Sequence, residues 1–159
     1  LLEAPSGEMK KEAWKALETV GIAEKAHENY LHLSEGQKQL CILARTLASE
    51  GRLLLLDEPE SALDFRYRYQ MLDLLRGWVR EEKRAVLAAL HAPSLALNYC
   101  DRLLLLADGK VLAVLKPGTE PLNKMEEELG VLYGRVSLQR CRDKSGREQL
   151  VMLKEPETE

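Results

Sequence analysis

The sequence predicts an α/β fold. Two short apolar runs, at residues 52–57 (RLLLLD) and 84–90 (RAVLAAL), are typical of strands that are buried on both faces of a parallel sheet. Amphipathic helical segments alternate with these runs, which is the pattern of α/β proteins. A second pair of apolar runs flanks Asp108 and Gly109, a dipeptide that favours a tight hairpin turn.

The helices are predicted from spacing and from their start and stop signals. In the first one, Ala13, Ala16, Leu17 and Val20 recur at helical spacing and Gly21 follows as a stop signal. In the helix predicted at 93–99, Pro93 occupies the first turn, where a backbone N–H would have no partner within the helix. The predicted helices cover residues 8–20, 34–49, 65–82 and 93–99, with a shorter helical stretch at 123–129.

The strands are predicted from apolar runs and turn residues. The two buried runs are followed by a hairpin and by two weaker candidates that a turn at residues 143–146 joins. After these candidates we expect a disordered tail. The strands are predicted at residues 52–57, 84–90, 102–107, 111–115, 135–139 and 148–153, and the tail at 154–159.

Composition excludes several classes of protein. The 159 residues are enough for a domain with a core, and the net charge of −3 argues against a general nucleic-acid or anionic-membrane binder. Cys41, Cys100 and Cys141 lie far apart and are odd in number, so we expect no disulfide framework or metal knuckle and a reducing compartment. No apolar run approaches a membrane span, and the first residues do not form a signal peptide. Because the first residue is Leu1, we expect a cut end or an incomplete reading frame.

Acidic side chains follow the first buried strand at the point where it ends. Asp57 and Glu58 come directly after four leucines, and Pro59 stops the strand because it cannot extend the ladder. His91 ends the next apolar run in the same way. Open α/β sheets place ligands at the carboxyl ends of their strands, where one acid can hold Mg²⁺ and another can orient a water. A solvated strand end with a satisfied histidine is the plain alternative.

The helix predicted from residue 34 begins in an unusual way. Ser34 and Gln37 have the spacing of a capping box, in which each side chain satisfies a backbone N–H of the other residue. Gly36 does not fit that explanation, since glycine weakens a helix. It does allow another group to approach the backbone closely. Free N–H groups at a helix N-terminus bind anions, so this helix start is a candidate anion site.

Four motifs together resemble the ATP-binding-cassette ATPases. LSEGQ at 33–37, LLLLDEP at 53–59, SALD at 61–64 and His91 have the order and spacing of that family's signature motif, Walker B strand, D-loop and switch histidine. The resemblance covers about residues 8–153. Residues 94–113 and 130–134 resemble the subgroup that powers importers for iron-siderophores, haem and cobalamin. The resemblance implies a P-loop NTPase-like fold, of which this chain is the C-terminal part.

The resemblance also implies an organisation. Residues 1–45 are expected to form part of the helical subdomain that carries the signature motif. Residues 46–115 are expected to form the Walker B side of the ATPase core, on a mostly parallel sheet. Residues 116–153 are expected to form a C-terminal helical and β appendage, and residues 154–159 the tail.

The family's cofactors and partners follow from the resemblance as expectations. The cofactors are ATP and Mg²⁺, and two ATPase domains pair head to tail. The other partners are transmembrane permease subunits, so we expect a cytoplasmic location on the inner face of the cell membrane and no nucleic-acid partner.

The same resemblance assigns roles to individual residues. Ser34 and the amides of Gly36 and Gln37 are expected to cap the γ-phosphate of ATP that the other domain holds. Asp57 is expected to serve Mg²⁺, and Asp64 to reach across the dimer interface. Two further residues are expected to be catalytic: Glu58, which acts on the attacking water, and His91, which contacts the γ-phosphate.

Two positions depart from the family pattern. Glu35 stands where the family usually has a small residue, and an acid there would repel a triphosphate if it pointed at one. We expect it to face away. After His91 the family often has Asp-Leu, whereas this chain has Ala92 and Pro93, which changes how the histidine is held.

A larger departure is the phosphate loop. No G-x-x-x-x-G-K-S/T occurs in the 159 residues, although that loop supplies the backbone N–H groups and the lysine that hold the phosphates. The family's adenine-stacking aromatic residue and its glutamine loop are missing as well. We therefore expect the chain alone to bind ATP poorly and not to hydrolyse it. We also expect an exposed sheet edge or face.

Three functions remain open at this point. The first is a fragment of the ATPase subunit of a membrane importer. The second is the C-terminal lobe of a DNA-repair or chromosome-maintenance ATPase, which would need a long heptad-patterned coiled coil before the signature. Only a short amphipathic helix precedes it here. The third is a non-catalytic half-domain that binds another protein, against which the retention of both Asp57 and Glu58 argues.

Overall fold

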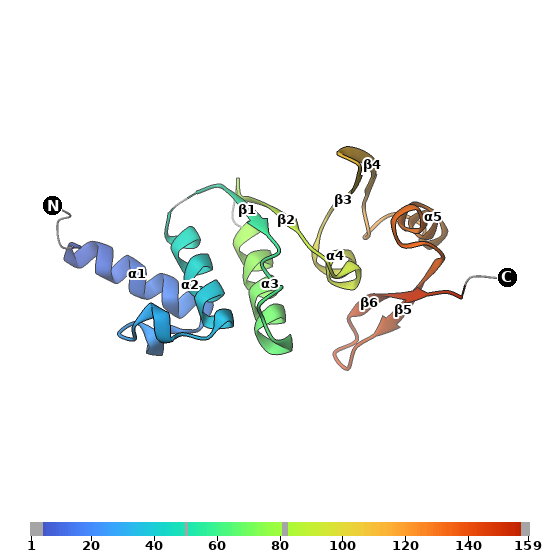
Figure 1. Cartoon of the computed structure of the whole chain (residues 1–159). Coiled ribbons are helices and arrows are strands. Elements are labelled where there is room, and N and C mark those ends of the chain that lie inside the picture. Colours follow the sequence, from blue (N-terminus) through green and yellow to red (C-terminus); the bar gives the residue numbers. More distant parts are fainter. Residues whose placement is uncertain (1–4, 50, 81–82, 157–159) are drawn as a thin grey trace. The chain divides into compact units, whose positions relative to one another are not determined.

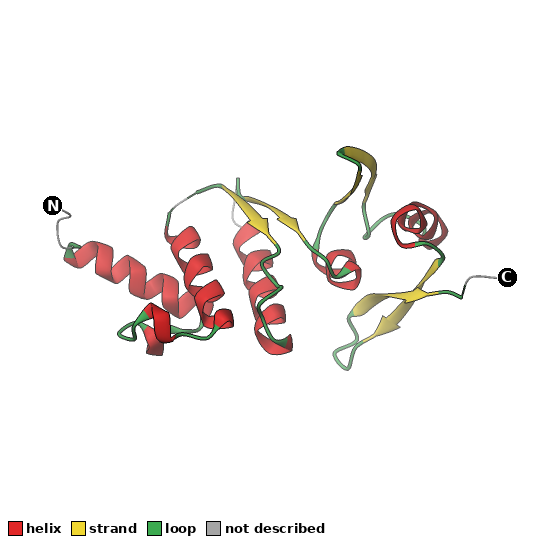
Figure 2. Ribbon diagram, viewed as in Figure 1, coloured by secondary structure: helices red, strands yellow, loops and turns green. Residues whose placement is uncertain are grey.

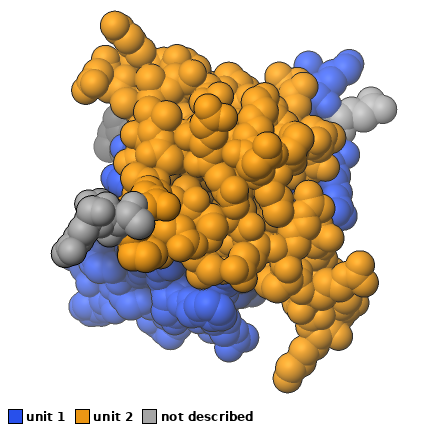
Figure 3. All heavy atoms as spheres, turned by 90° about the vertical axis from the view of Figure 1, so that its right-hand side faces the viewer, with its two compact units in different colours: residues 1–91 blue, residues 92–159 orange. Residues whose placement is uncertain are grey.

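The computed structural model describes residues 5–49, 51–80 and 83–156. The chain divides into two compact units, Leu1–His91 and Ala92–Glu159, which Figure 3 shows in separate colours. The division falls inside the segment 46–115 that we expected to be one side of an ATPase core. The units are described separately below.

The first unit contains helices and one pair of strands (Figure 1). Its elements are α1 (Gly7–Val20), η1 (Ala23–Lys25), η2 (Tyr30–His32), α2 (Glu35–Ala48), β1 (Leu53–Asp57), α3 (Phe65–Val79) and β2 (Ala85–Ala89). The helix predicted at 65–82 therefore ends earlier, at Val79, and residues 81–82 lie outside the described part.

The described residues of the second unit, 92–156, form two helices and two hairpins (Figure 2). Its elements are α4 (Pro93–Tyr99), β3 (Leu103–Ala107), β4 (Lys110–Leu115), α5 (Leu122–Tyr133), β5 (Val136–Arg142) and β6 (Glu148–Lys154). The predicted hairpin is confirmed: Asp108 and Gly109 form its two-residue turn, and both have positive φ (50° and 72°). The two weak strand candidates are confirmed as well, and both are longer than predicted.

The expectation of a disordered tail at residues 154–159 is wrong for its first two residues. Lys154 is the last residue of β6 and pairs with Val136. The backbone N–H of Glu155 donates to the carbonyl of Arg135 at 2.9 Å. Hydrogen bonding to the preceding hairpin strand therefore orders residues 154 and 155, which corrects the expectation for these residues. Residues 157–159 lie outside the described part.

The parallel pair β1–β2 fixes the position of the acidic strand end. Its register runs from Leu53 opposite Ala85 to Asp57 opposite Ala89. Because parallel strands point the same way, the residues that follow both strands emerge at one edge. The loop after Asp57 and the segment at His91 are thereby neighbours. Among the described strands, parallel pairing is confined to β1–β2, because β3–β4 and β5–β6 are antiparallel.

The expectation that both strands are buried on both faces is wrong for the described residues. Leu54 is 2% exposed, but Leu55 is 68% exposed and Leu87 is 55% exposed. The side chains alternate across the sheet, so one row faces inward and the other outward. The sequence supplies apolar side chains for both faces, but the described residues cover only one.

The two units have separate apolar cores. In the first unit α1 packs on α2, and Val20, Ile22, Leu40 and Leu54 are almost completely buried. In the second unit the core joins α4, both hairpins and α5 around Met125. Its buried members are Leu97, Leu103, Leu105, Leu115, Met125, Leu129, Leu138 and Leu150. No helix in the described residues is long and apolar enough to cross a membrane.

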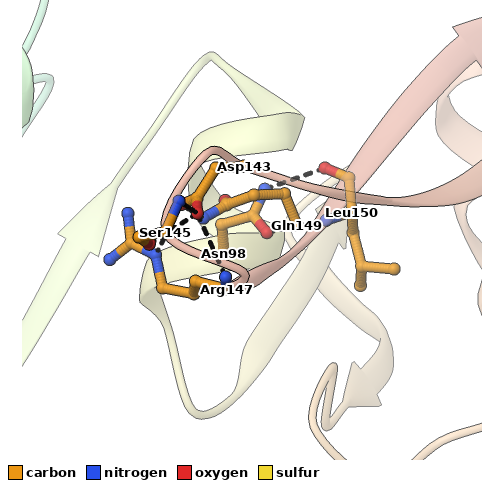
Figure 4. Close-up of polar contacts among 6 residues, drawn as sticks. All are labelled: Asn98, Asp143, Ser145, Arg147, Gln149 and Leu150. Carbon is orange, nitrogen blue, oxygen red and sulfur yellow. Dashed lines mark hydrogen bonds and ion pairs between the residues drawn. The ribbon is translucent and has the colours of Figure 1, made fainter.

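Asn98 on α4 links this helix to β6. Its side-chain oxygen accepts a hydrogen bond from the Leu150 N–H at 2.8 Å, and its Nδ2 donates to the Leu150 carbonyl at 2.8 Å (Figure 4). The side-chain amide thus pairs with both backbone groups of one strand residue, as a neighbouring strand would. Leu150 itself is buried. This pairing holds α4 against the last hairpin.

The turn of that hairpin is organised by Asp143. One carboxylate oxygen accepts from the Ser145 hydroxyl at 2.6 Å, from the Ser145 N–H at 2.9 Å and from the Arg147 N–H at 3.0 Å (Figure 4). These hydrogen bonds, that of the Ser145 hydroxyl first, lower the pKa of Asp143 to about 2, against a smaller opposing effect of burial. The turn is therefore an Asx-type structure with a local explanation.

We expect Asn98→Ala to lower the free energy of unfolding by about 2 kcal/mol, because it leaves a buried N–H and carbonyl of Leu150 without their partners. Urea unfolding of the purified chain measures this. Asn123→Ala, at an exposed position on α5, is the control and should change the free energy of unfolding by less than about 0.5 kcal/mol. Equal losses in the two variants would contradict the role given to Asn98.

Candidate functional site

The predicted site residues come from three segments of the first unit. They are the start of α2, the end of β1 with the loop that follows it (residues 57–64), and His91 after β2. The loop touches both of the other segments. A side chain at Gly36 would approach the Ala62 carbonyl at 3.3 Å, and Glu58 contacts His91. The structure therefore brings these three segments together around one loop.

Glu58 and His91 form an ion pair at the end of the parallel strands. His91 Nε2 lies 2.6 Å from Glu58 Oε1. Glu58 has a positive φ of 46°, so the chain turns sharply after β1, and its N–H donates to the carbonyl of Ala89 at 3.1 Å. A non-glycine residue with positive φ is uncommon. The turn directs the Glu58 side chain to the segment that follows β2 and so to His91.

Glu58 also changes the protonation of His91. The hydrogen bond with the Glu58 carboxylate raises the pKa of His91 above its usual value of 6.5, and the charges of Glu58, Glu60 and Asp57 raise the pKa further. Burial lowers the pKa of His91, by less than the hydrogen bond and charge of Glu58 raise it, and the His91 side chain is 75% exposed. His91 is therefore charged at a higher pH than an isolated histidine.

A third carboxylate, which the sequence analysis did not single out, holds His91 from the other side. Glu60 is only 4% exposed, and its Oε1 accepts a hydrogen bond from the His91 backbone N–H at 2.9 Å. The signal that could have drawn attention to it is an acid two residues after Glu58 in D-E-P-E. Its partner lies 31 positions away, so the sequence offered no sign of the contact.

The start of α2 has the predicted capping box. Ser34 Oγ accepts from the Gln37 N–H at 3.2 Å, and Gln37 Oε1 accepts from the Ser34 N–H at 3.0 Å. The structure also gives Gly36 a packing reason. A Cβ there would meet the Ala62 carbonyl at 3.3 Å and Leu63 Cδ2 at 3.6 Å, so glycine lets the helix start lie against the loop.

Two further acids of the site region have local partners. The Glu35 side chain is 77% exposed and pairs with Lys38 at 2.7 Å on its own helix. Its charge is thus partly compensated within α2. Asp64 is the N-cap of α3, where its Oδ1 accepts from the Tyr67 N–H at 2.9 Å.

The side chains at the end of β1 are better suited to bind Mg²⁺ than to bind a whole triphosphate. Asp57 is an exposed carboxylate at the strand end, and Mg²⁺ is usually bound by one or two carboxylates together with phosphate oxygens and waters. No group of three His, Cys, Asp or Glu side chains within the described ranges forms a metal site. A cavity of about 160 Å³ opens beside Asp57, but its lining, from α2, β1, the loop after β1 and α3, is mostly leucine and other apolar side chains. That lining lacks the cationic groups that hold phosphates.

Comparisons with known proteins find the same family that the motifs of the sequence resemble. A family model described as ABC transporter matches residues 2–61. A solved structure of an ABC transporter assigned to the metal-chelate type, in an inward-facing conformation, matches with a TM-score of 0.80 and 28% identity. The match covers 96% of this chain and 60% of that one. Over the matched residues the chain is similar to the ATPase domains of ATP-binding-cassette (ABC) transporters.

Two curated relatives are named as ATP-binding proteins of import systems. "Cobalamin import ATP-binding protein BtuD" of Halobacterium salinarum is 41% identical over 97 residues, which are 61% of this chain and 24% of that protein. "Aliphatic sulfonates import ATP-binding protein SsuB 2" of Pseudomonas aeruginosa is 46% identical over 105 residues, 66% of this chain and 38% of that protein. The chain thus spans less than two fifths of either relative.

We expect Glu58→Gln to lower the pKa of His91 toward 6.5, because the variant removes the carboxylate that favours the imidazolium. The raised pKa means that the pair's contribution to stability is complete below about pH 6.5 and is lost as the pH rises through the raised value. An NMR titration of the His91 ring measures the pKa. Glu28→Gln, which removes the ion pair with Lys25, is the control and should leave the His91 titration unchanged. If His91 has the same pKa in Glu58→Gln as in the unaltered chain, the pair does not form in solution.

Proposed function

We propose that this chain supplies the signature and Walker B side of the ATPase subunit of an ABC importer. The observation that carries the proposal is the contact between His91 Nε2 and Glu58 Oε1 at 2.6 Å, which joins the switch histidine and the Walker B acid. The two residues lie 33 positions apart, and each stands in the corresponding family motif. The importer relatives favour this function over a DNA-repair lobe or a non-catalytic module.

In this proposal Asp57, Glu58 and His91 share the work of ATP hydrolysis. Asp57 is a ligand of Mg²⁺, which neutralises charge on the phosphates when it is bound. The Glu58 carboxylate orients the attacking water and accepts its proton. His91 contacts the γ-phosphate with its ring, and its raised pKa favours the cationic form that a phosphate attracts.

The start of α2 and the loop have the roles that the family implies. Ser34 and the N–H groups of Gly36 and Gln37 bind the γ-phosphate of ATP held by a second ATPase domain, paired head to tail. The capping box does not prevent this, because a helix N-terminus has several free N–H groups. Asp64 belongs to the same interface. The ion pair between Glu35 and Lys38 weakens the repulsion that Glu35 would exert on a phosphate.

The 159 residues by themselves are proposed to be inactive. Three phosphates need a loop of backbone N–H groups and a lysine, and no such motif occurs in these residues. In the complete ATPase domain another layer would cover the exposed apolar row on β1 and β2. Such a complete domain would act with transmembrane permease subunits at the cytoplasmic face of a membrane.

The imported substrate is proposed only as a class. The relatives' names refer to cobalamin and to aliphatic sulfonates, and the solved structure is assigned to the metal-chelate type. The metal-chelate type of the solved structure and the cobalamin relative agree with the resemblance of residues 94–113 and 130–134 to importers of iron-siderophores, haem and cobalamin. We therefore propose a metal-chelate importer.

Binding and hydrolysis of ATP by the purified chain test the proposal. With Mg²⁺ and ATP we expect no hydrolysis above that of Glu58→Gln, because the phosphate loop is missing. We expect weak binding, with a dissociation constant on the order of millimolar, that shifts the amide NMR signals of Gly36 and Gln37. Ser34→Ala should reduce these shifts, and Ser6→Ala, which removes the cap of α1, should not.

Three outcomes would contradict parts of the proposal. Hydrolysis that disappears in Glu58→Gln would mean that these residues form a complete phosphate site. Shifts confined to other residues would exclude the start of α2 as the phosphate contact. Shifts that Ser34→Ala leaves unchanged would exclude Ser34 as a contributor.

A further inference from the structure

Glu60 is a buried acid with an unusual pattern of contacts. It is the one charged or polar residue that is buried within the described ranges, with 4% of its surface exposed. Its Oε1 accepts from the His91 N–H at 2.9 Å. Its Oε2 is buried too and has no hydrogen-bond partner among the described residues. Burying a carboxylate with so few donors is costly, so packing alone does not explain a glutamate here.

His91 lies beyond the reach of the strand ladder. β2 ends at Ala89, and the paired register ends there as well. The following residues, Ala92 and Pro93, lead into α4, and Ala92 is extended, with φ −94° and ψ 100°. The bond from the His91 N–H to Glu60 therefore replaces the ladder bond that a strand residue would have.

The two carboxylates hold the same histidine at two points. Glu58 contacts the ring of His91, and Glu60 contacts its backbone N–H. The His91 side chain is 75% exposed, so surrounding side chains do little to fix its direction. When the backbone N–H is fixed, the start of the side chain is fixed too. The ring then meets Glu58 without a long search among rotamers.

Backbone hydrogen bonds within the loop hold the backbone of Glu60 in place. The Ser61 N–H donates to the Glu58 carbonyl at 3.1 Å, and the Leu63 N–H donates to the Glu60 carbonyl at 3.2 Å. The Glu58 N–H is bonded to the Ala89 carbonyl. The loop and the end of β2 thus form one hydrogen-bonded unit, in which Glu60 makes the side-chain link.

We propose that Glu60 is a positioning residue that fixes the backbone of His91 and thereby directs its ring to Glu58. The consequence of this positioning for ATP hydrolysis rests on the proposed function, in which His91 contacts the γ-phosphate. The positioning itself does not depend on nucleotide, and so it can be tested separately.

The test compares three variants of the whole chain by NMR and hydrogen exchange. Glu60→Gln keeps an acceptor oxygen in place, whereas Glu60→Met keeps the length but removes the acceptor. The control is Glu126→Met, because Glu126 Oε1 accepts from the Leu138 N–H at 2.6 Å in the second unit. Ring signals of His91 are recorded at about pH 5.5, where the imidazole is protonated.

Loss of the acceptor should change both the amide and the ring of His91. In Glu60→Met we expect the His91 amide to exchange about tenfold faster or more, since its hydrogen bond is lost. We also expect its ring signals to move toward those of Glu58→Gln. In Glu60→Gln both should remain close to the unaltered chain. Glu126→Met should accelerate exchange at Leu138 and leave His91 as it was.

Two results would overturn the proposal. One is a Glu60→Met chain with lower stability but unchanged ring signals of His91, which would mean a purely structural role. The other is a Glu60→Gln chain that loses the His91 ring position as fully as Glu60→Met does, because then charge and not the acceptor would matter. If Glu60→Met does not fold, Glu60→Asp replaces it, since the shorter side chain withdraws the acceptor. All readouts are made without nucleotide, so failure of ATP binding would not affect them.

Discussion

The parallel pairing of β1 with β2 is the constraint on which the site depends. It places Asp57 opposite Ala89, so the residues that follow the two strands emerge at one edge. The positive φ of Glu58 and its bond to the Ala89 carbonyl then turn the loop across the end of β2. A shift in this register would separate Glu58 from His91. Backbone hydrogen bonds thus determine where Glu58 and His91 lie relative to one another.

The motif residues also have structural tasks, which explains why local and functional interpretations agree. Ser34 and Asp64 each cap a helix, and Gly36 lets one of these helices lie against the loop that leads to the other. A substitution at one of them would therefore lower stability as well as the phosphate binding that the proposed function assigns to this region. Separating the two effects needs a measurement that reads the site itself, since activity alone combines them.

The sequence predicted the elements of this fold well but not their surroundings. Apolar runs, Asp108-Gly109 and the capping residues located the helices and strands, because these signals are local. The same runs predicted burial on both faces, and Leu55 and Leu87 are exposed instead. Periodicity reports which side chains are apolar, not whether another layer covers them. The role of Glu60 was unpredictable for a related reason, since its partner is a backbone N–H 31 positions away.

The loop places three carboxylates within four residues and satisfies each by a different means. Asp57 is exposed, where water or Mg²⁺ can compensate its charge. Glu58 pairs with the ring of His91, and Glu60 accepts from the backbone of the same residue. Like charges so close repel one another, and all three raise the pKa of His91. The acids therefore favour the imidazolium that offsets them, so His91 is the counter-charge of the loop.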